Sequence, residues 1–514
     1  MVELVREMKG TRDRAAGSAV FILTLAVFLA CHVRQVADSR YSILLGERLL
    51  HHGSFALDPR AFAGIAGPSG AGWHGMYQLE LVEGRVYYYF PPGSSILSLP
   101  YVALMNAAGI SATHVDGTYD PRGEKLVQAS LAALLMAAFS SLVFFSSRLL
   151  LSQGWSLAIA LGVACGTQVL STTSRGLWSD TWGIVLLGLV VYLLLAAEGR
   201  GSVSRDGTRT HDPAEGGHVR LPGVALATLV SWGYFVRPTN SVTVVAVTAW
   251  VILFHRAVLV RYLLAGAAWL VAFVCYSWSQ FGQLLPHYYL ADRLDFRSFW
   301  WALPGNLVSP SRGLLIFVPI TLFVVYLAAR YASDLPSPRL AALCAFVMVA
   351  HLVVASGFSP WWGGHCYGPR FTAGLVPWLA LLAILAIAAR LSRRAHEQVG
   401  RSWTWRIEIA VGSALLLTSV AINARGAADS ATARWNVTPV NVDEHPERLW
   451  DWQHPQFLAR DGGGRVADDR RQFAAPARAR ESPRPRRDSA SSSAARSASR
   501  SAAASCRPPK LSRT

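Results

Sequence analysis

The sequence predicts an all-α protein, a polytopic bundle of about eleven or twelve transmembrane helices. Its 514 residues are 52% hydrophobic and only 15% charged. The apolar residues form long unbroken blocks instead of the alternation typical of strands. Eleven of these blocks approach the roughly 20 residues that a spanning helix needs. They cover residues 18–36, 126–147, 155–173, 180–197, 221–236, 240–255, 259–278, 312–330, 340–357, 371–390 and 407–424.

The first apolar block and the weakest one differ from the other blocks in the residues that precede or open them. Four basic residues, Arg6, Lys9, Arg12 and Arg14, precede the first block, as in a signal sequence. No small-residue cleavage site follows it, so we expect it to stay as the first helix. A weaker apolar block at residues 91–109 opens with two prolines.

The charges of the loops predict the orientation, because cytoplasmic loops concentrate Lys and Arg. The basic amino terminus belongs inside, which places residues 37–90 outside as a large loop. Four later connections are basic and also belong inside; their arginines are Arg200, Arg205, Arg209 and Arg220, then Arg256 and Arg261, then Arg330 and Arg339, then Arg390, Arg393, Arg394, Arg401 and Arg406. The complementary connections are outside: 174–180, 237–239, 279–311, 358–370 and 425 onward. This alternation requires one block between residues 91 and 173 not to span, and we expect it to be 91–109.

The chain therefore divides into four parts in the cell (inner or plasma) membrane. These are a basic cytoplasmic amino terminus (1–17), a transmembrane bundle (18–424, with external loop 37–90), an external carboxy-terminal segment (425–459) and a tail (460–514). The tail is rich in Arg, Ser and Ala and lacks periodicity, which is typical of disorder. The net charge of +17 is split between loops and tail, so we infer no nucleic-acid partner.

The first external loop begins with a carboxylate. Asp38 follows the first apolar block directly, so we expect it near the water boundary, with Arg40 beside it. The apolar residues of Tyr41–His52 recur at helical spacing, which predicts a helix lying in the membrane interface. The alternative role for Asp38 is the N-cap of that helix.

The same loop closes with an aromatic run, Val86–Phe90, which contains Tyr88 and Tyr89 and leads into Pro91-Pro92. One interpretation is an aromatic belt at the level of the lipid headgroups. The other is a platform for a sugar or an isoprenoid, with the prolines fixing the entry of the chain into the membrane.

Later external connections place charged side chains at the mouths of helices. Arg175 and Asp180 lie in one connection and Arg237 in the next. The densest cluster is Pro360–Arg370, which contains His365, Tyr367 and Arg370 among tryptophans and glycines. An external Arg fits the charge rule poorly unless it meets an anion such as a lipid phosphate. The alternative is an Arg that reaches out to a headgroup.

These residues together resemble the GT-C glycosyltransferases, of the protein mannosyltransferase and lipid A aminoarabinose transferase kind, which use polyprenyl-phosphate sugars. The resemblance covers most of residues 18–460. It is carried by the acidic residue that opens the first loop, the Pro-Pro element and the Arg and Asp residues at helix mouths. Trp361–Arg370 looks like a motif of uncharacterised bacterial members, and Pro446–Leu458 looks like their usual carboxy-terminal end.

The resemblance implies an inverting glycosyltransferase in which Asp38 is the general base. Arg237 and Arg370, and Arg175 less directly, would bind the phosphate of the leaving lipid. The remaining residues expected to bind substrate are Arg40, Tyr88, Tyr89, Asp180, His365 and Tyr367. The chain has Phe90 where the family often has a phosphate-binding Lys. No Asp-x-Asp element follows Asp38, so we expect neither a metal site nor a cofactor.

The expected partners are a polyprenyl-phosphate sugar, membrane lipids, and a glycan, lipid or protein acceptor of the cell envelope. Two hypotheses from other classes compete with the transferase. A transporter or lipid flippase would carry ionisable residues and broken helices near the membrane midplane, often in two related halves. A non-catalytic scaffold would use the Trp- and Arg-rich loops to dock proteins. The crowding of polar groups on one face favours the transferase.

Overall fold

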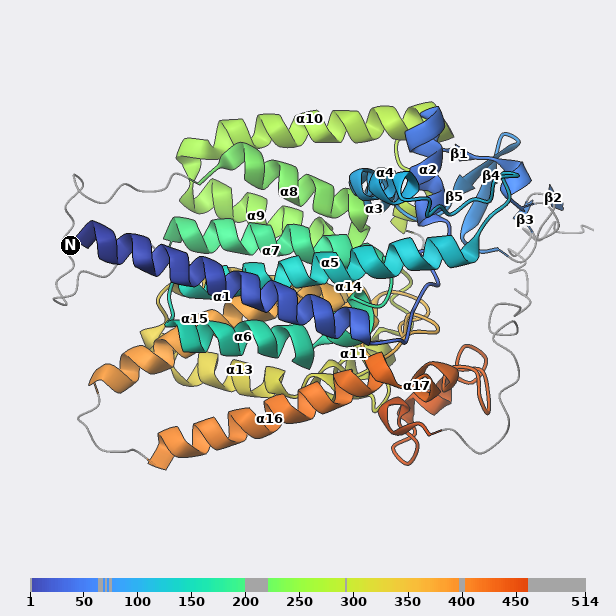
Figure 1. The fold of residues 1–514 in the computed structure, drawn as a ribbon. Helices are drawn as coiled ribbons and strands as arrows, with labels where there is room; N and C mark the ends of the chain where they lie inside the picture. Colours follow the sequence, from blue (N-terminus) through green and yellow to red (C-terminus); the bar gives the residue numbers. More distant parts are fainter. Residues whose placement is uncertain are drawn as a thin grey trace, which may run out of the picture.

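The computed structural model describes residues 2–62, 68–69, 72–73, 76–198, 221–291, 294–396 and 403–460. Long helices lie side by side in one bundle (Figure 1). Within the described ranges, seven helices are long and apolar enough to cross a membrane, and four shorter apolar helices accompany them. The prediction of a multi-pass, all-helical membrane protein is confirmed.

The predicted apolar blocks correspond to helices of the bundle, some of them broken. The helices are α1 (Val2–Ala30), α5 (Pro121–Arg148), α6 (Gln153–Gly166), α7 (Ser179–Glu198), α8 (Gly223–Val236), α9 (Ser241–Phe254), α10 (Arg256–Phe281), α12 (Leu314–Phe317), α13 (Ile320–Arg330), α14 (Pro338–Ser356), α15 (Val376–His396) and α16 (Trp403–Ala428). A five-residue π-helix, η2 (Val169–Thr173), follows α6, and short 3-10 turns connect other helices: η3 (Pro238–Asn240), η4 (His287–Tyr289), η6 (Ala332–Asp334) and η7 (Arg370–Leu375).

The centre of the bundle is formed by α5, α7 and α15. The apolar window of α15 is 83% buried and that of α5 is 67% buried, whereas the windows of α10 and α16 are only 11% and 17% buried. Small residues permit the close approach, as in other membrane bundles. A Cβ at Gly188 of α7 would lie 2.8 Å from the ring of Phe139 of α5. The helices α10 and α16 therefore form the periphery.

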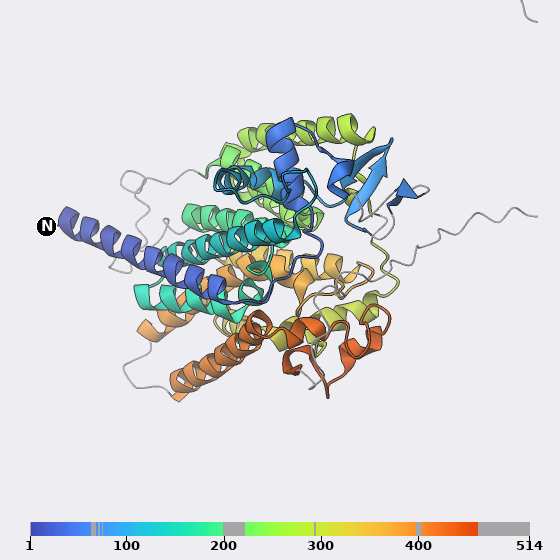
Figure 2. The same ribbon diagram turned by 45° about the vertical axis from the view of Figure 1, so that its right-hand side comes forward.

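The connections predicted to be external gather at one end of the bundle, called here the loop end (Figures 1 and 2). Backbone hydrogen bonds join them: Gln35 N donates to Arg175 O at 2.9 Å, and Asp295 N donates to Gly357 O at 2.8 Å. The amino terminus lies at the opposite end. The predicted grouping of these connections on one face is therefore confirmed.

The first loop contains more sheet than the sequence predicted. The expected interfacial helix is present as α2 (Ser42–His52), followed by η1 (Pro59–Phe62). Three strands, β1 (Ala56–Leu57), β5 (Arg85–Tyr88) and β4 (Leu79–Val82), form an antiparallel sheet in that order, and β2 (Pro68–Ser69) pairs with β3 (Gly72–Trp73). Glu83 and Gly84 have φ of 49° and 77°, as a two-residue hairpin turn requires. Strands of two to four residues are too short to show a clear alternation.

The weak block at 91–109 does not span. It forms α3 (Gly93–Leu97) and α4 (Leu99–Ala107). A helix of nine residues is about 14 Å long, less than half of the roughly 30 Å hydrocarbon core. The end of α8 holds α3 closely, since a Cβ at Gly93 would lie 2.6 Å from Phe235 O. The prediction that this block fails to cross is confirmed.

The first helix differs from its predicted bounds. It begins at Val2, so residues 2–17 of the predicted basic segment are helical and continuous with the first apolar block. It also ends at Ala30, six residues before the predicted end at 36. At this end the side chain of Arg175 donates to Phe28 O and Cys31 O, which is consistent with a helix that stops here.

The carboxy-terminal segment forms a small cap at the loop end. It consists of α17 (Ala431–Arg434), η8 (Pro446–Trp450) and η9 (Gln456–Leu458), and it packs on α11 (Phe299–Val308) through a cluster that includes Ala302, Trp361, Trp435 and Leu449. The predicted basic connection with Arg200, Arg205, Arg209 and Arg220, Arg401, and the predicted tail beyond residue 460 lie outside the described residues.

Candidate active site

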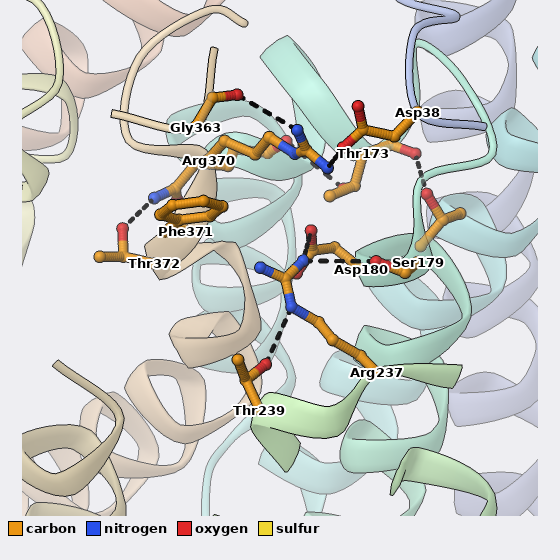
Figure 3. Close-up of polar contacts among 12 residues, drawn as sticks. Asp38, Thr173, Ser179, Asp180, Arg237, Thr239, Gly363, Arg370, Phe371 and Thr372 are labelled. Atoms are coloured by element: carbon orange, nitrogen blue, oxygen red, sulfur yellow. Dashed lines mark hydrogen bonds and ion pairs between the residues drawn. The ribbon is translucent and has the colours of Figure 1, made fainter. Parts of the chain in front are cut away.

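The structure joins Asp38 to Arg370, which is 332 residues away in the chain. The Asp38 carboxylate forms an ion pair with the Arg370 guanidinium through Oδ2 (Figure 3). Its Oδ1 accepts a hydrogen bond from the Tyr77 hydroxyl at 3.0 Å. The Asp38 side chain is 23% exposed. Asp38 does not cap α2, because the N-cap position is occupied by Tyr41. The N-cap alternative is therefore wrong.

The Arg370 guanidinium is fixed on more than one side. Its Nη1 donates to Gly363 O at 3.3 Å, and its Cζ lies 3.8 Å from the centroid of the Trp178 ring. A guanidinium stacked on an aromatic face gains a cation–π attraction that is larger where water is excluded. A planar group that is stacked and paired in this way cannot be replaced by the point charge of a Lys.

A second ion pair, between Asp180 and Arg237, lies beside the first. Asp180 is in the first turn of α7, where the helix dipole favours a negative charge. Arg237 Nε also donates to Thr239 Oγ1 at 2.9 Å. Asp180 Oδ1 is buried and has no hydrogen-bond partner among the residues that the structure describes. This oxygen is a polar group still available to a ligand.

Phe371 lies next to both pairs (Figure 3). Its ring centroid is 6.0 Å from the Cζ of Arg370 and 5.9 Å from the Cζ of Arg237. His351 Nε2 donates to Phe371 O at 2.9 Å, which fixes the backbone at this point. Asp38, Arg370, Asp180 and Arg237 are called the four-charge cluster below. Two positive charges and two negative charges give it no net charge.

Three side chains fix the backbone around Asp38. The Tyr88 hydroxyl donates to Asp38 O at 2.6 Å, Gln78 Nε2 to Ala37 O at 3.1 Å and Gln128 Nε2 to Ser39 O at 2.7 Å. Burial and the negative charge of Asp38 raise the pKa of Tyr88 well above its ordinary value, so its hydroxyl remains a donor. Gln128 Oε1 also accepts from Leu177 N at 3.2 Å, which ties Asp38 to the segment that carries Trp178.

An aromatic wall stands beside the carboxylate. It consists of Tyr77, Tyr89, Phe90 and Tyr288. The Phe90 ring is 6.1 Å from Tyr77, 5.7 Å from Tyr89 and 5.2 Å from Tyr288, measured between centroids. Because Tyr77 also contacts Asp38 directly, the wall and the four-charge cluster form one continuous surface.

The carboxy-terminal cap fixes the loop that carries Arg370. Gln456 Oε1 accepts from Gly368 N at 3.0 Å, while its Nε2 donates to Cys366 O at 2.9 Å. The buried Arg312 donates to Gln456 Oε1 at 2.6 Å and to Trp362 O at 3.2 Å. The two long side chains therefore bridge the cap and residues 360–370.

Arg175 does not join the cluster. Its guanidinium donates to Phe28 O at 2.6 Å, in the last turn of α1, and to Cys31 O at 2.9 Å, which also accepts from Arg34 Nη1 at 2.6 Å. Burial lowers the pKa of Arg175 to about 10, so it is still charged at neutral pH. A cation at a helix carboxy terminus is favourable because of the helix dipole. Its position indicates that it terminates α1 and directs the chain toward Asp38.

Replacing Arg175 with Met is therefore expected to destabilise the protein. It leaves the buried Phe28 carbonyl without its donor, whereas Cys31 O keeps the Arg34 guanidinium, and one such unpaired group costs about 1–3 kcal/mol. We expect the thermal midpoint of the purified protein to fall by several degrees. The matched control is Arg297→Met, since that side chain is 89% exposed. Equal midpoints for both variants would contradict the capping role.

The structure places two further predicted residues, His365 and Tyr367, in other contacts than those of the four-charge cluster. His365 Nε2 faces the cap, 2.8 Å from Asn441 Oδ1 and 3.4 Å from Asp443 Oδ2. Tyr367 is buried, and its hydroxyl donates to Ile422 O at 2.7 Å. Arg40 interacts electrostatically with the buried Glu124. Across the described ranges, no group of three or more His, Cys, Asp or Glu is placed to hold a metal ion.

Sequence reasoning missed several residues that shape the site. Tyr77, Trp178, Phe371, Gln128 and Gln456 contact or position the charged groups. Phe371 and Trp178 are next to or within two residues of predicted positions, so a wider search around Arg370 and Asp180 would have found them. Tyr77 and Gln128 carry no local signal, because their roles arise only from contacts between distant segments.

The comparisons with known proteins returned only structural similarity. No family model and no curated protein matches the chain. ArnT from Cupriavidus metallidurans, solved with bound undecaprenyl phosphate, is similar over 83% of this chain and 68% of its own, with 14% identity and a TM-score of 0.44. Archaeal oligosaccharyltransferase AglB from Archaeoglobus fulgidus, solved with an inhibitory peptide and a dolichol-phosphate, is similar over 86% of this chain and 60% of its own, with 12% identity and a TM-score of 0.41.

Proposed function

We propose that this protein is a membrane glycosyltransferase that moves a sugar from a polyprenyl-phosphate donor to an acceptor of the cell envelope. The single observation that carries the proposal is the four-charge cluster, in which a partly exposed carboxylate is paired with one guanidinium and a second ion pair lies beside it at the loop end. The sequence resemblance to the GT-C glycosyltransferases supports the same reaction. The predicted orientation puts this end at the outer face of the cell membrane.

In the proposed reaction Asp38 is the general base. A hydroxyl or amine of the acceptor attacks the anomeric carbon and passes its proton to the Asp38 carboxylate as the new glycosidic bond forms. The bond between the anomeric carbon and the phosphate oxygen breaks, and that oxygen keeps the electron pair. A single displacement of this kind inverts the configuration of the sugar. The products are the glycosylated acceptor and the polyprenyl phosphate.

The arginines of the cluster stabilise the charge on the leaving phosphate. Guanidinium groups bind phosphate in a bidentate manner, and fixed charges act strongly where water is excluded. Arg370 and Arg237 substitute for the Lys that the family often has at the position of Phe90. Since Arg370 is paired with Asp38 in the structure, an incoming phosphate competes for it. Phosphate binding to Arg370 then releases Asp38 Oδ2 to receive the proton.

The aromatic wall supplies the neighbouring surface. Tyr77 combines an exposed ring with a hydroxyl bonded to Asp38, so a sugar ring lying on it is next to the base. Aromatic side chains that present an apolar face and a polar edge suit an amphipathic ring. Tyr89 and Phe90 keep the role of platform that their sequence suggested, whereas Tyr88 positions the Asp38 backbone.

The test is a transfer assay with the purified protein in liposomes. A panel of radiolabelled polyprenyl-phosphate sugars is supplied with membrane extract as the source of acceptor. We expect the labelled sugar of one donor to be transferred to an acceptor. The labelled product is then recognised because it no longer partitions with the donor lipid. The Asp58→Asn variant, a carboxylate of the same loop paired only with exposed Arg60, is expected to match the native chain.

Two results would overturn the proposal. One is the absence of transfer from every donor of the panel while the protein remains folded. The other is movement of labelled lipid across the liposome membrane without any new glycosidic bond, which would favour a flippase.

A further inference from the structure

A cavity of about 220 Å³ lies between α6, α13, α15 and α16. Its wall is mostly apolar and includes Ile159, Val163, Val324, Leu379 and Leu416. The lining residues of α6 run from Trp155 to Thr167, which corresponds to about 18 Å of helix. This length is close to half of the roughly 30 Å hydrocarbon core. The cavity therefore has the polarity and the length of a single lipid chain in one leaflet.

One end of the cavity is aromatic and charged. Arg390 Nε donates to Glu408 Oε2 at 2.6 Å, and the Tyr331 hydroxyl donates to Glu408 Oε1 at 2.6 Å. The Trp155 and Trp405 rings lie 6.0 Å apart at the same end. Tryptophan is enriched at the level of the headgroups, so this end marks the membrane surface.

Positive charge remains in excess beyond that end. The Arg390–Glu408 pair is neutral as a unit, but the exposed Arg394 lies with its Cζ 4.4 Å from the Trp405 ring. Arg406, one residue after Trp405, is exposed as well. Basic pockets between transmembrane helices on the cytoplasmic side are typical binding sites for anionic headgroups. The charge at the mouth therefore complements a lipid phosphate.

The cavity is separate from the four-charge cluster. Both lie along α15 and the turn that precedes it, but Arg370 is at the loop end whereas Arg390 is 20 residues further on, or about 30 Å along a helix. The basic connection between α15 and α16 is predicted to be cytoplasmic, as is the amino terminus, which lies at the end opposite the loops. On its outer side the cavity is bounded by α16, a helix of the periphery.

We propose that this cavity binds one hydrocarbon chain of an anionic membrane phospholipid, whose headgroup phosphate lies beside Arg394 and Trp405. The apolar wall accepts the chain, the paired tryptophans mark the headgroup level, and the surplus arginine charge selects an anionic headgroup over a zwitterionic one. The site lies at the end of the bundle opposite the proposed transfer reaction and does not depend on it.

The experiment is native mass spectrometry of the full chain, purified in mild detergent and incubated with phosphatidylglycerol or phosphatidylcholine. We expect the native protein to retain phosphatidylglycerol in preference, and Arg394→Ala to reduce that preference by about fivefold, since one basic residue near a membrane surface contributes about 1 kcal/mol.

Two variants fill the cavity from opposite walls, Ala158→Phe on α6 and Ser413→Phe on α16. Both positions line the cavity and are exposed, so the larger ring is accommodated without repacking the core. We expect both variants to lose the bound lipid and to keep the native thermal midpoint. The matched control is Ala268→Phe, an exposed position on α10 away from the cavity, which should retain lipid as the native chain does.

Three results would overturn the proposal. The first is equal retention of lipid by the native protein and both cavity-filling variants. The second is equal retention of phosphatidylglycerol and phosphatidylcholine. The third is displacement of the bound phospholipid by an equimolar amount of polyprenyl phosphate, which would make a polyprenyl chain the occupant.

Discussion

Changing Asp38 to Asn is expected to lower the rate of sugar transfer by about 10²–10⁴-fold, the usual contribution of a general base. The amide keeps the shape of the side chain. Its oxygen can still accept from Arg370 and its nitrogen can face the Tyr77 hydroxyl, so the local contacts survive. What the amide cannot do is accept a proton from the acceptor as the glycosidic bond forms. The loss should therefore appear in the turnover rate and not in the amount of folded protein.

The measurement is the initial rate of label transfer in liposomes at saturating donor, with the thermal midpoint recorded for each variant. Asp58→Asn serves as the control because it makes the same chemical change in the same loop, at a carboxylate that is 26% exposed and is paired with Arg60 instead of Arg370. Transfer by Asp38→Asn at the native rate would exclude Asp38 as the base while leaving the transferase assignment intact.

Changing Arg370 to Ala is expected to lower transfer by about 10²–10³-fold, the typical effect of removing one fixed group that stabilises charge in the transition state. The loss has two physical sources. The leaving phosphate loses a guanidinium, and the Asp38 carboxylate loses the group that orients it. Arg370→Lys should restore little, because an ammonium has no planar face to stack on Trp178 and cannot reproduce the fixed fork with which the guanidinium reaches both Asp38 and Gly363.

The double variant Asp38→Asn with Arg370→Ala separates these sources. Residues that act as one unit show losses that are not additive. If Arg370 acts mainly by orienting Asp38, the double variant should transfer no more slowly than Asp38→Asn alone. If Arg370 also stabilises the phosphate, a further loss should remain. Native rates in Arg370→Ala would remove this residue from the mechanism, and Arg297→Ala controls for the loss of an external arginine.

The bundle could be predicted from the sequence because a bilayer imposes its thickness on every spanning helix. The block at 371–390 corresponds to α15 and the block at 126–147 to α5, with bounds that differ from the predicted ones by one to six residues. The weak block at 91–109 was recognised because basic and neutral connections must alternate. The predicted end of α1 was wrong. Arg175 binds the carbonyl of Phe28 near this end, and the local sequence of α1 gives no signal of that distant contact.

The candidate site was only partly predictable, because its contacts join segments that are distant in the sequence. Asp38, Asp180, Arg237 and Arg370 could be selected because ionisable groups are rare in an apolar chain and these four stand at helix mouths. The sequence did not show which of these residues pair, because Asp38 and Arg370 are 332 residues apart in the chain. Arg175 has the same chemistry and the same kind of position, yet it binds backbone carbonyls. Residue type and position in the chain identified the candidates. Only the packed structure shows which of them form ion pairs and which bind the backbone.

The pairing of Asp38 with Arg370 has a consequence for an enzyme at rest. In the proposed reaction, Asp38 stays paired with Arg370 until the phosphate of the donor lipid binds Arg370. Water or an acceptor that reaches Asp38 before the donor therefore meets a carboxylate whose Oδ2 is already paired with Arg370. The donor itself would therefore activate the base, because Asp38 becomes free to accept a proton only when the donor phosphate has bound Arg370.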